Sequence, residues 1–327
     1  MSTKSMIVGT GSAIPRRVIH NKDLERMVET SDEWIRTRTG IVSRHVVSPD
    51  ETNSAIATLA AKKALENAGI NATEIDLIVV ATLTPDMFMP TVACLVQDAL
   101  DAKKAGAFDL SATCSGFLYG LAMADGYLRI HPDHKVLVIG SEVLSRRVNW
   151  KDRGTCILFG DGAGAVVLTG TREDRGIIST HLHADGSLWE LLTIRGLGTK
   201  EEVTPAQLEA GHQFIEMNGR EVFKHAVRAL ESVTMEALQS AGWKGDELDL
   251  FVPHQANMRI IEHLRARLGL SREKVFINID KYGNTSAASI PIALDEANRL
   301  DILKPGAKVL MAAFGGGFTW GSCAMKW

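Results

Sequence analysis

Cysteine is scarce in this sequence. Only four of its 327 residues are cysteines, and they stand far apart with no C-x-x-C pair: Cys94, Cys114, Cys156 and Cys323. Zinc sites and disulfide frameworks use closely or regularly spaced cysteines, so this spacing argues against both. Widely separated free thiols are typical of a reducing compartment, and we expect a cytoplasmic protein.

Long apolar runs and clusters of one charge are also missing. No apolar run approaches the roughly 18 residues that cross a membrane, and the N-terminal stretch is too short for a signal peptide. The 36 basic and 39 acidic residues give a net charge of −3, with no prominent lysine or arginine run. We therefore expect neither nucleic acid nor a membrane surface as a partner.

Cys114 stands where an apolar stretch gives way to a helical pattern. Residues 108–110 are typical of the end of a buried strand, and residues 117–128 are apolar nearly all round, as in a buried helix. A thiol at such a junction faces unpaired backbone N–H groups and the positive end of the helix dipole, which both favour the thiolate. A lone cysteine is often just a small buried hydrophobic residue, so Cys114 alone proves little.

Two downstream segments supply residue types that strengthen this candidate. They are Pro253-His254-Gln-Ala-Asn257 and Tyr282-Gly-Asn284-Thr-Ser-Ala-Ala-Ser289. Taken singly, His254 and Asn284 could be ordinary turn residues. A cysteine, a histidine and an asparagine, each beside a turn-forming glycine or proline, together indicate nucleophilic catalysis.

The chain contains an internal repeat. Residues 64–80 align with residues 237–253 at an offset of 173, with eight of 17 positions identical, and Lys135-Val-Leu matches Lys308-Val-Leu at the same offset. Each copy is typical of an amphipathic helix, an Ala-Gly stop, an acidic turn and a buried strand. By this offset Cys114 corresponds to Ala287 and Ser111 to Asn284. We expect the two turns to meet at a pseudo-twofold axis.

The repeat also predicts the fold class. Helices that alternate with near-continuous apolar strands indicate mainly parallel sheets covered by helices. We expect an α/β protein of five layers built from two pseudo-symmetric halves. Residues 1–173 would carry the nucleophile, and residues 174–327 would carry the histidine, the asparagine and a glycine-rich loop.

Several long motifs, in register over the whole chain, resemble one enzyme family. They are Asp109-Leu-Ser-Ala-Thr-Cys114-Ser-Gly-Phe, Pro253-His254-Gln-Ala-Asn257, Gly283-Asn284-Thr-Ser-Ala-Ala-Ser289 and Phe314-Gly-Gly-Gly-Phe-Thr-Trp-Gly321. This set resembles β-ketoacyl-acyl carrier protein synthase III, of the thiolase-like superfamily. The resemblance implies a homodimer without metal or cofactor. It also implies condensation of a short acyl-CoA primer, acetyl-CoA above all, with malonyl-acyl carrier protein, which releases CO₂ and CoA.

The resemblance assigns roles in this chemistry. Cys114 would attack the acyl-CoA thioester, and the backbone N–H groups of Cys114 and Gly316 would hold the oxyanion. His254 and Asn284 would donate hydrogen bonds to the malonyl thioester carbonyl as negative charge builds on it.

The resemblance also implies the binding residues. CoA would contact Trp34, Arg38 and Arg153 at the adenine end, and Gly219, Phe223, Asn257 and Phe314 farther in. The acidic carrier protein would contact Gln255, Ala256, Asn257, Met258 and Arg259, with help from Arg220 and Lys224.

Met89 stands where the best-known members carry a phenylalanine that closes the acyl pocket from across the dimer. We therefore expect primers somewhat longer than acetyl to be tolerated. Residues 196–212 fit the family pattern poorly.

Four rival functions remain. A related thiolase-fold enzyme with longer or specialised primers would share the same three residues. A degradative thiolase would need a second cysteine near the glycine-rich loop, and Cys323 does not stand there. A cysteine hydrolase also has Cys, His and Asn in chain order, but its asparagine would orient the histidine and it would lack the repeat. A non-catalytic acyl-CoA-binding protein would not need Cys114.

Overall fold

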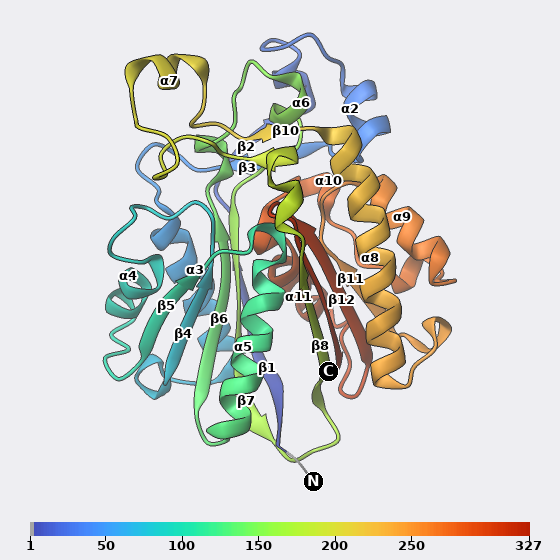
Figure 1. Ribbon diagram of the computed structural model, residues 1–327. Helices are drawn as coiled ribbons and strands as arrows, with labels where there is room; N and C mark the ends of the chain where they lie inside the picture. The colour runs from blue at the N-terminus through green and yellow to red at the C-terminus, as the bar shows by residue number, and fades with distance from the viewer. Residues whose placement is uncertain (1–2) are drawn as a thin grey trace.

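The fold is built on two mixed β-sheets (Figure 1). The strands of the first come from residues 4–171 and those of the second from residues 176–326. This computed structural model describes residues 3–327. The first sheet has five strands, in the spatial order β1 (Lys4–Ala13), β7 (Gly162–Thr171), β6 (Lys135–Glu142), β4 (Leu77–Ala81) and β5 (Gly106–Leu110). The second has four, in the order β8 (Gly176–Ala184), β13 (Thr319–Lys326), β12 (Lys308–Gly315) and β11 (Leu250–Pro253).

Helices form the remaining three layers, which confirms the five-layered α/β fold (Figure 1). The central layer, between the sheets, consists of α5 (Gly116–Ile130) and α11 (Ser289–Arg299), whose apolar residues join both sheets in one core. On the outer face of the first sheet lie α3 (Asn53–Ala68) and α4 (Val92–Ala99). On the outer face of the second lie α8 (Gly219–Ala241) and α9 (Met258–Arg267).

The internal repeat is visible in matching elements. Gly69 caps the end of α3 and Gly242 caps the end of α8, both in the left-handed conformation and at the offset of 173, as the Ala-Gly stops predict. The offset also relates β4 to β11, β6 to β12 and α5 to α11. The first sheet ends at Thr171 and the second begins at Gly176, so we propose residues 1–173 and 174–327 as the two halves of one folding unit.

The expectation of mainly parallel sheets is wrong. The pairs β4–β5, β4–β6 and β11–β12 are parallel, whereas β1–β7, β6–β7, β12–β13 and β13–β8 are antiparallel. Helices cover both faces of the first sheet, so its strands are apolar on both sides whichever way they run. The direction of β13 follows from a different cue, because three residues join it to β12 and so short a link forces a hairpin.

Shorter elements form a cap over the carboxyl ends of the parallel strands (Figure 1). Buried apolar residues from this region pack into a separate cluster. The elements are α1 (Asn21–Leu24), α2 (Asp32–Thr39), α6 (Arg153–Cys156), α7 (Pro205–Ala210), α10 (Ile279–Tyr282), β2 (Arg17–His20), β3 (Ser43–Val46), β9 (Leu192–Thr193) and β10 (Glu216–Met217).

Among residues 3–327, no helix is both long and apolar enough to cross a membrane. The cytoplasmic location stays a prediction.

Candidate active site

The two equivalent turns meet beneath the cap, as the repeat predicts. The turn Thr113–Ser115 precedes α5, and the turn Ser286–Ala288 precedes α11 at the offset of 173. Thr113 and Ser286 both adopt the left-handed conformation, with φ of 47° and 49°. Non-glycine residues rarely take this conformation outside functional or tightly constrained turns. The shared backbone geometry therefore marks the junction as a candidate site.

Cys114, His254 and Asn284 line the same cavity, of about 110 Å³. Cys114 follows β5, His254 follows β11, and Asn284 follows α10. All three side chains are buried. The structure thus brings together the three residues that the sequence singles out. Cys114 and His254 lie near the carboxyl ends of strands, where open α/β sheets bind ligands.

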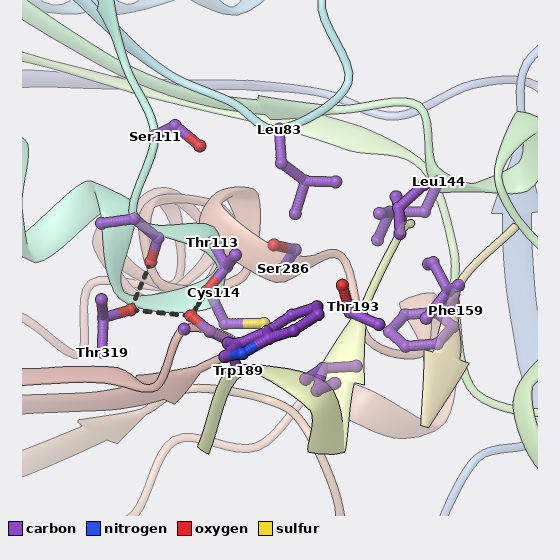
Figure 2. A pocket seen from close by; sticks show the side chains of 16 residues that line it. Leu83, Ser111, Thr113, Cys114, Leu144, Phe159, Trp189, Thr193, Ser286 and Thr319 are labelled. Atoms are coloured by element: carbon purple, nitrogen blue, oxygen red, sulfur yellow. Dashed lines mark hydrogen bonds between the residues drawn. The ribbon is translucent and has the colours of Figure 1, made fainter. Parts of the chain in front are cut away.

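A second cavity, of about 430 Å³, begins at the other side of Cys114 (Figure 2). It shares Cys114, Phe159 and Leu192 with the first cavity. Its wall is mostly apolar and includes Leu83, Leu144, Trp189, Ile194 and Ile215. The thiol therefore stands between a narrow space that contains the polar pair and a wider apolar space.

The hydrogen bonds of His254 favour one tautomer. Ser289 Oγ lies 2.6 Å from His254 Nδ1 and accepts the backbone N–H of Gln255 at 3.4 Å. Its own proton is then available to Nδ1, which leaves the imidazole proton on Nε2. Within residues 3–327 the buried Nε2 has no hydrogen-bond partner. His254 thus offers an N–H to a ligand in the cavity, and burial lowers its pKa to about 3, so the ring stays neutral.

Asn284 is held in a complementary way. Its backbone N–H donates to Leu158 at 2.9 Å, and its carbonyl accepts from Gly160 at 3.0 Å. Its side-chain Oδ1 accepts the backbone N–H of Ser286 at 2.9 Å. Because the oxygen is occupied, the NH₂ group is the end left for a ligand. Two uncharged donors, one from His254 and one from Asn284, therefore line the same cavity.

These contacts separate the rival functions. In a cysteine hydrolase the asparagine would hold the histidine, but here the Nδ1 of His254 is held by Ser289 and the Oδ1 of Asn284 by Ser286. Cys323, the residue that a degradative thiolase would need near the glycine-rich loop, is fully buried within β13 and lines neither cavity. The geometry favours neither rival.

The resting thiol is not the low-pKa thiol that its position before a helix suggests. Burial raises the pKa of Cys114 to about 12, and hydrogen bonding from Ser286 offsets part of this effect. Desolvation of a thiolate in an apolar cavity outweighs the partial charge of a helix end. The thiolate must therefore form as the bond to substrate forms, and the expectation of a pre-ionised Cys114 is corrected.

This pKa has a direct consequence for thiol chemistry. Below a pKa of about 12 the thiolate fraction rises tenfold with each pH unit. We expect the rate of Cys114 alkylation by iodoacetamide, followed by peptide mass spectrometry, to climb from pH 6 to pH 9 without levelling off. The exposed Cys94 reports reagent activity in the same samples. A plateau near neutral pH would contradict the raised pKa.

The residues assigned to the adenine end of CoA lie together on the surface. The guanidinium carbon of Arg153 lies 4.8 Å from the centre of the Trp34 ring, and that of Arg38 lies 5.4 Å from it. Both arginines are exposed, and the indole is partly exposed. An aromatic face between two cations is suited to an adenine and phosphates.

The residues assigned to the inner part of the CoA path line the cavity that contains His254. They are Gly219, Phe223, Asn257 and Phe314. The side chain of Asn257 also donates to the backbone carbonyl of Arg38 at 3.1 Å, which ties the cavity to the arginine cluster. Gly316 lines the wider cavity beside Cys114, and its carbonyl accepts from Thr113 at 2.9 Å.

The run from Gln255 to Arg259 is not one contact surface. Gln255 is 1% exposed, and its amide bonds to the backbone of Pro253, Phe276, Asn278 and Ile279. The prediction that Gln255 contacts a carrier protein is therefore corrected. Ala256, Asn257 and Met258 are half-buried, and Arg259 alone in this run is exposed, stacked over Phe223 at 5.0 Å. Arg220 and Lys224 are exposed nearby on α8.

Met89 lies outside both cavities of its own chain. It is 85% exposed, beside Phe88 at 83%. Phe88 lines a neighbouring cavity together with residues 196–198, and that cavity shares Leu83 and Ile194 with the one beside Cys114. The unassigned segment 196–212 thus lies partly beside the loop that carries Met89.

Sequence reasoning missed Glu142 and Ser286. Glu142 ends β6, is fully buried and hydrogen-bonds Ser286 at 3.0 Å. The sequence feature that could have singled out Glu142 is a carboxylate at the end of the otherwise apolar strand Lys135-Val-Leu-Val-Ile-Gly-Ser-Glu142. Across residues 3–327, no group of three or more His, Cys, Asp or Glu side chains is placed to hold a metal ion.

Comparisons with known proteins agree with this geometry. The family model described as 3-oxoacyl-[acyl-carrier-protein] synthase III matches residues 108–186, and the model of its C-terminal part matches residues 238–327. The beta-ketoacyl-[acyl-carrier-protein] synthase III of Roseiflexus sp. strain RS-1 is 49% identical over 100% of this chain and 99% of that protein.

Solved structures extend the likeness to three dimensions. The 3-oxoacyl-[acyl-carrier-protein] synthase III of Aquifex aeolicus VF5 is 50% identical, with a TM-score of 0.92 over 99% of this chain and 100% of that one. The priming beta-ketosynthase of the R1128 polyketide pathway is 35% identical, with a TM-score of 0.92 over 99% of this chain and 97% of that one.

Proposed function

The chain belongs to the 3-oxoacyl-[acyl-carrier-protein] synthase III family, and from this premise we propose its primer, its partners and the role of each site residue. As a member it is an acyltransferase that performs the initiating condensation of fatty acid synthesis. We propose that acetyl-CoA is a primer and that malonyl-acyl carrier protein is the second substrate. The observation that carries the proposal is a buried thiol that shares one cavity with two uncharged hydrogen-bond donors.

In the first half-reaction Cys114 attacks the acyl-CoA thioester and CoA leaves. The acyl group then lies in the wider apolar cavity, while the pantetheine arm has occupied the cavity lined by Phe223 and Asn257. The backbone N–H groups of Cys114 and Gly316 hold the oxyanion of the tetrahedral intermediate. Covalent attachment divides one difficult transfer into two easier ones.

In the second half-reaction the malonyl thioester carbonyl accepts hydrogen bonds from His254 Nε2 and Asn284 Nδ2. As CO₂ departs, negative charge accumulates on that oxygen, and both donors bind it more strongly in the transition state. The resulting carbanion attacks the acyl group on Cys114 and releases the thiolate. A neutral His254 suits this role, since its N–H is retained across the working pH range.

Mass spectrometry tests this proposal most directly. We expect acetyl-CoA alone to add one acetyl group to Cys114, and malonyl-acyl carrier protein to discharge it as 3-oxobutyryl-carrier protein. A primer-by-primer assay then separates this enzyme from a relative devoted to a specialised ketide. Absence of any acyl group on Cys114 would contradict the assigned nucleophile.

The partner surfaces are also proposals. The strand β5 lies at the edge of its sheet, and an unpaired edge can pair with a second copy. Exposed apolar residues lie near it, at Met87, Phe88, Met89 and Phe108. We therefore place the homodimer contact there. We place the acidic carrier protein at Arg259, with Arg220 and Lys224 beside it, because exposed cations steer an anionic partner.

Met89 gives a prediction on primer length. If it closes the partner's acyl pocket, its flexible side chain yields to longer primers more readily than a phenylalanine ring would. Each buried methylene gains about 0.8 kcal/mol, which is a several-fold preference. We expect Met89→Phe to lower the rates with butyryl- and hexanoyl-CoA several-fold relative to acetyl-CoA. Unchanged relative rates would remove Met89 from the pocket.

A further inference from the structure

Glu142 is a buried carboxyl group at the reaction centre, and the chemistry described so far does not use it. It is 0% exposed, at the end of β6. Its carboxyl group accepts hydrogen bonds from Thr84 Oγ1 at 2.6 Å, Ser286 Oγ at 3.0 Å, the Leu83 N–H at 3.2 Å and Thr82 Oγ1 at 3.3 Å. Four donors aimed at one carboxyl group form a site built for a carboxylate.

Two of these donors are fixed by the backbone. Thr82 Oγ1 accepts the N–H of Thr84 at 3.1 Å, and Thr84 Oγ1 accepts the N–H of Val143 at 2.8 Å. Their hydroxyl protons are therefore directed at Glu142. Ser286 differs, because it donates to Glu142 and also lines the wider cavity beside the Cys114 thiol, with which it hydrogen-bonds. Figure 2 shows Ser286 and Cys114 in the wall of that cavity.

Glu142 and Cys114 are poor partners as two anions, because ionisation of either group opposes ionisation of the other. Burial raises the pKa of Glu142 to about 7, and its hydrogen bonds offset part of this effect. Cys114 is the ionisable neighbour, and the charge of Glu142 contributes to the raised pKa of its thiol. Two anions side by side in an apolar interior are costly, so one proton shared between them is the stable arrangement. When the thiol loses its proton, Glu142 is the nearby group able to take it.

We infer that Glu142 is a positioning residue that receives the Cys114 thiol proton through the Ser286 hydroxyl during acylation and returns it when the product leaves. This rests on the proposed role of Cys114 as the nucleophile.

The transfer is balanced in both half-reactions. As the sulfur–carbon bond forms, the thiol proton moves to Ser286 Oγ and the Ser286 proton moves to the carboxylate of Glu142. The thioester bond to CoA breaks, and the CoA thiolate takes a proton from water. In the second half-reaction the carbanion displaces Cys114, and its thiolate takes a proton back from Glu142 through Ser286. Acetylation therefore uses Glu142 as the carboxylate, and the return step uses it as the acid.

The pH dependence of a single turnover tests this inference. The full-length protein is mixed with acetyl-CoA alone at pH values from about 5.5 to about 9, and acetylation of Cys114 is measured by mass spectrometry in quenched samples. Glu142 can accept the thiol proton only as the carboxylate, and its pKa is about 7. We expect the acetylation rate to fall as the pH drops below about 7 and to level off above it.

Variants locate the proton. Glu142→Gln and Ser286→Ala are expected to remove the levelling off above pH 7 and to slow acetylation about 100-fold or more, the usual scale for loss of a proton acceptor. Glu296→Gln is the matched control, since Glu296 is equally a buried glutamate but bonds to Asn278 and Lys281 away from the cavities. We expect the control to keep the parental rate and its levelling off above pH 7. Ser286→Ala leaves Glu142 in place, so the test does not depend on the folding of Glu142→Gln.

The outcomes distinguish this inference from the function on which it rests. Acetylation of Cys114 in the parent protein at a rate that rises through pH 9 without levelling off would overturn the role of Glu142 and leave the nucleophile intact. Levelling off that persists in both Glu142→Gln and Ser286→Ala would do the same. A parent protein that never acetylates Cys114 would instead overturn the proposed nucleophile, and this inference with it.

Discussion

Replacement of Cys114 by serine is expected to abolish acyl transfer from CoA while the fold stays intact. A serine hydroxyl is far harder to ionise than a thiol, and it needs a strong base to attack a thioester. Burial lowers the pKa of His254 to about 3, and its Nδ1 already faces Ser289. Glu142, with a pKa of about 7, is too weak a base to take the proton of a hydroxyl group. We expect a loss on the order of 10⁶, the scale seen when a hydrolase loses its nucleophile.

The measurement follows the acyl group and the fold separately. Radiolabelled acetyl-CoA reports transfer to protein, and thermal unfolding reports stability. Serine differs from cysteine by one atom in a closely packed turn, where a side-chain carbon added at Gly315 would lie 2.6 Å from the backbone nitrogen of Cys114. We therefore expect only a small shift in the unfolding temperature. Condensation at the parental rate would remove Cys114 from the mechanism.

Much of the fold could be predicted because the sequence repeats itself. The offset of 173 relates the cap of α3 at Gly69 to that of α8 at Gly242, and it places Cys114 and Asn284 in paired turns. Strand direction was missed for a physical reason. Burial on two faces produces the same apolar pattern in parallel and antiparallel strands, so the apolar patterns of β7 and β13 do not reveal their direction.

Some residues of the site could likewise be predicted from the sequence, and others could not. Cys114, His254 and Asn284 could be found because each stands near a glycine or proline that is typical of a turn. Their side chains are also of the types that nucleophilic catalysis uses. Glu142 could not be connected to Cys114, because their contact depends on how β6 packs against the turn before α11. A side chain added at Gly140 would lie 2.2 Å from the carbonyl oxygen of Ala287, which shows how closely those elements approach. Gln255 was misassigned because a motif gives no measure of exposure.

His254 and Asn284 are expected to serve only the second half-reaction. His254→Ala or Asn284→Ala should still acquire an acetyl group on Cys114, since neither side chain takes part in attack on the primer. Each variant loses one donor to the oxygen that gains charge as CO₂ leaves. Loss of one such donor costs about 100- to 1,000-fold in rate. Release of labelled CO₂ from malonyl-carrier protein should fall by that factor in each variant.

The separation of half-reactions is what makes this test decisive. A variant that merely unfolds would lose acetylation and decarboxylation together, whereas loss of a donor affects the second alone. His263→Ala offers a matched control, because His263 is a half-exposed histidine on α9 outside the cavities, and both half-reactions should continue at the parental rate. Because His254 and Asn284 donate to the same developing charge, the double variant should lose less than the product of the single losses. Normal CO₂ release by both single variants would mean that the malonyl carbonyl binds elsewhere.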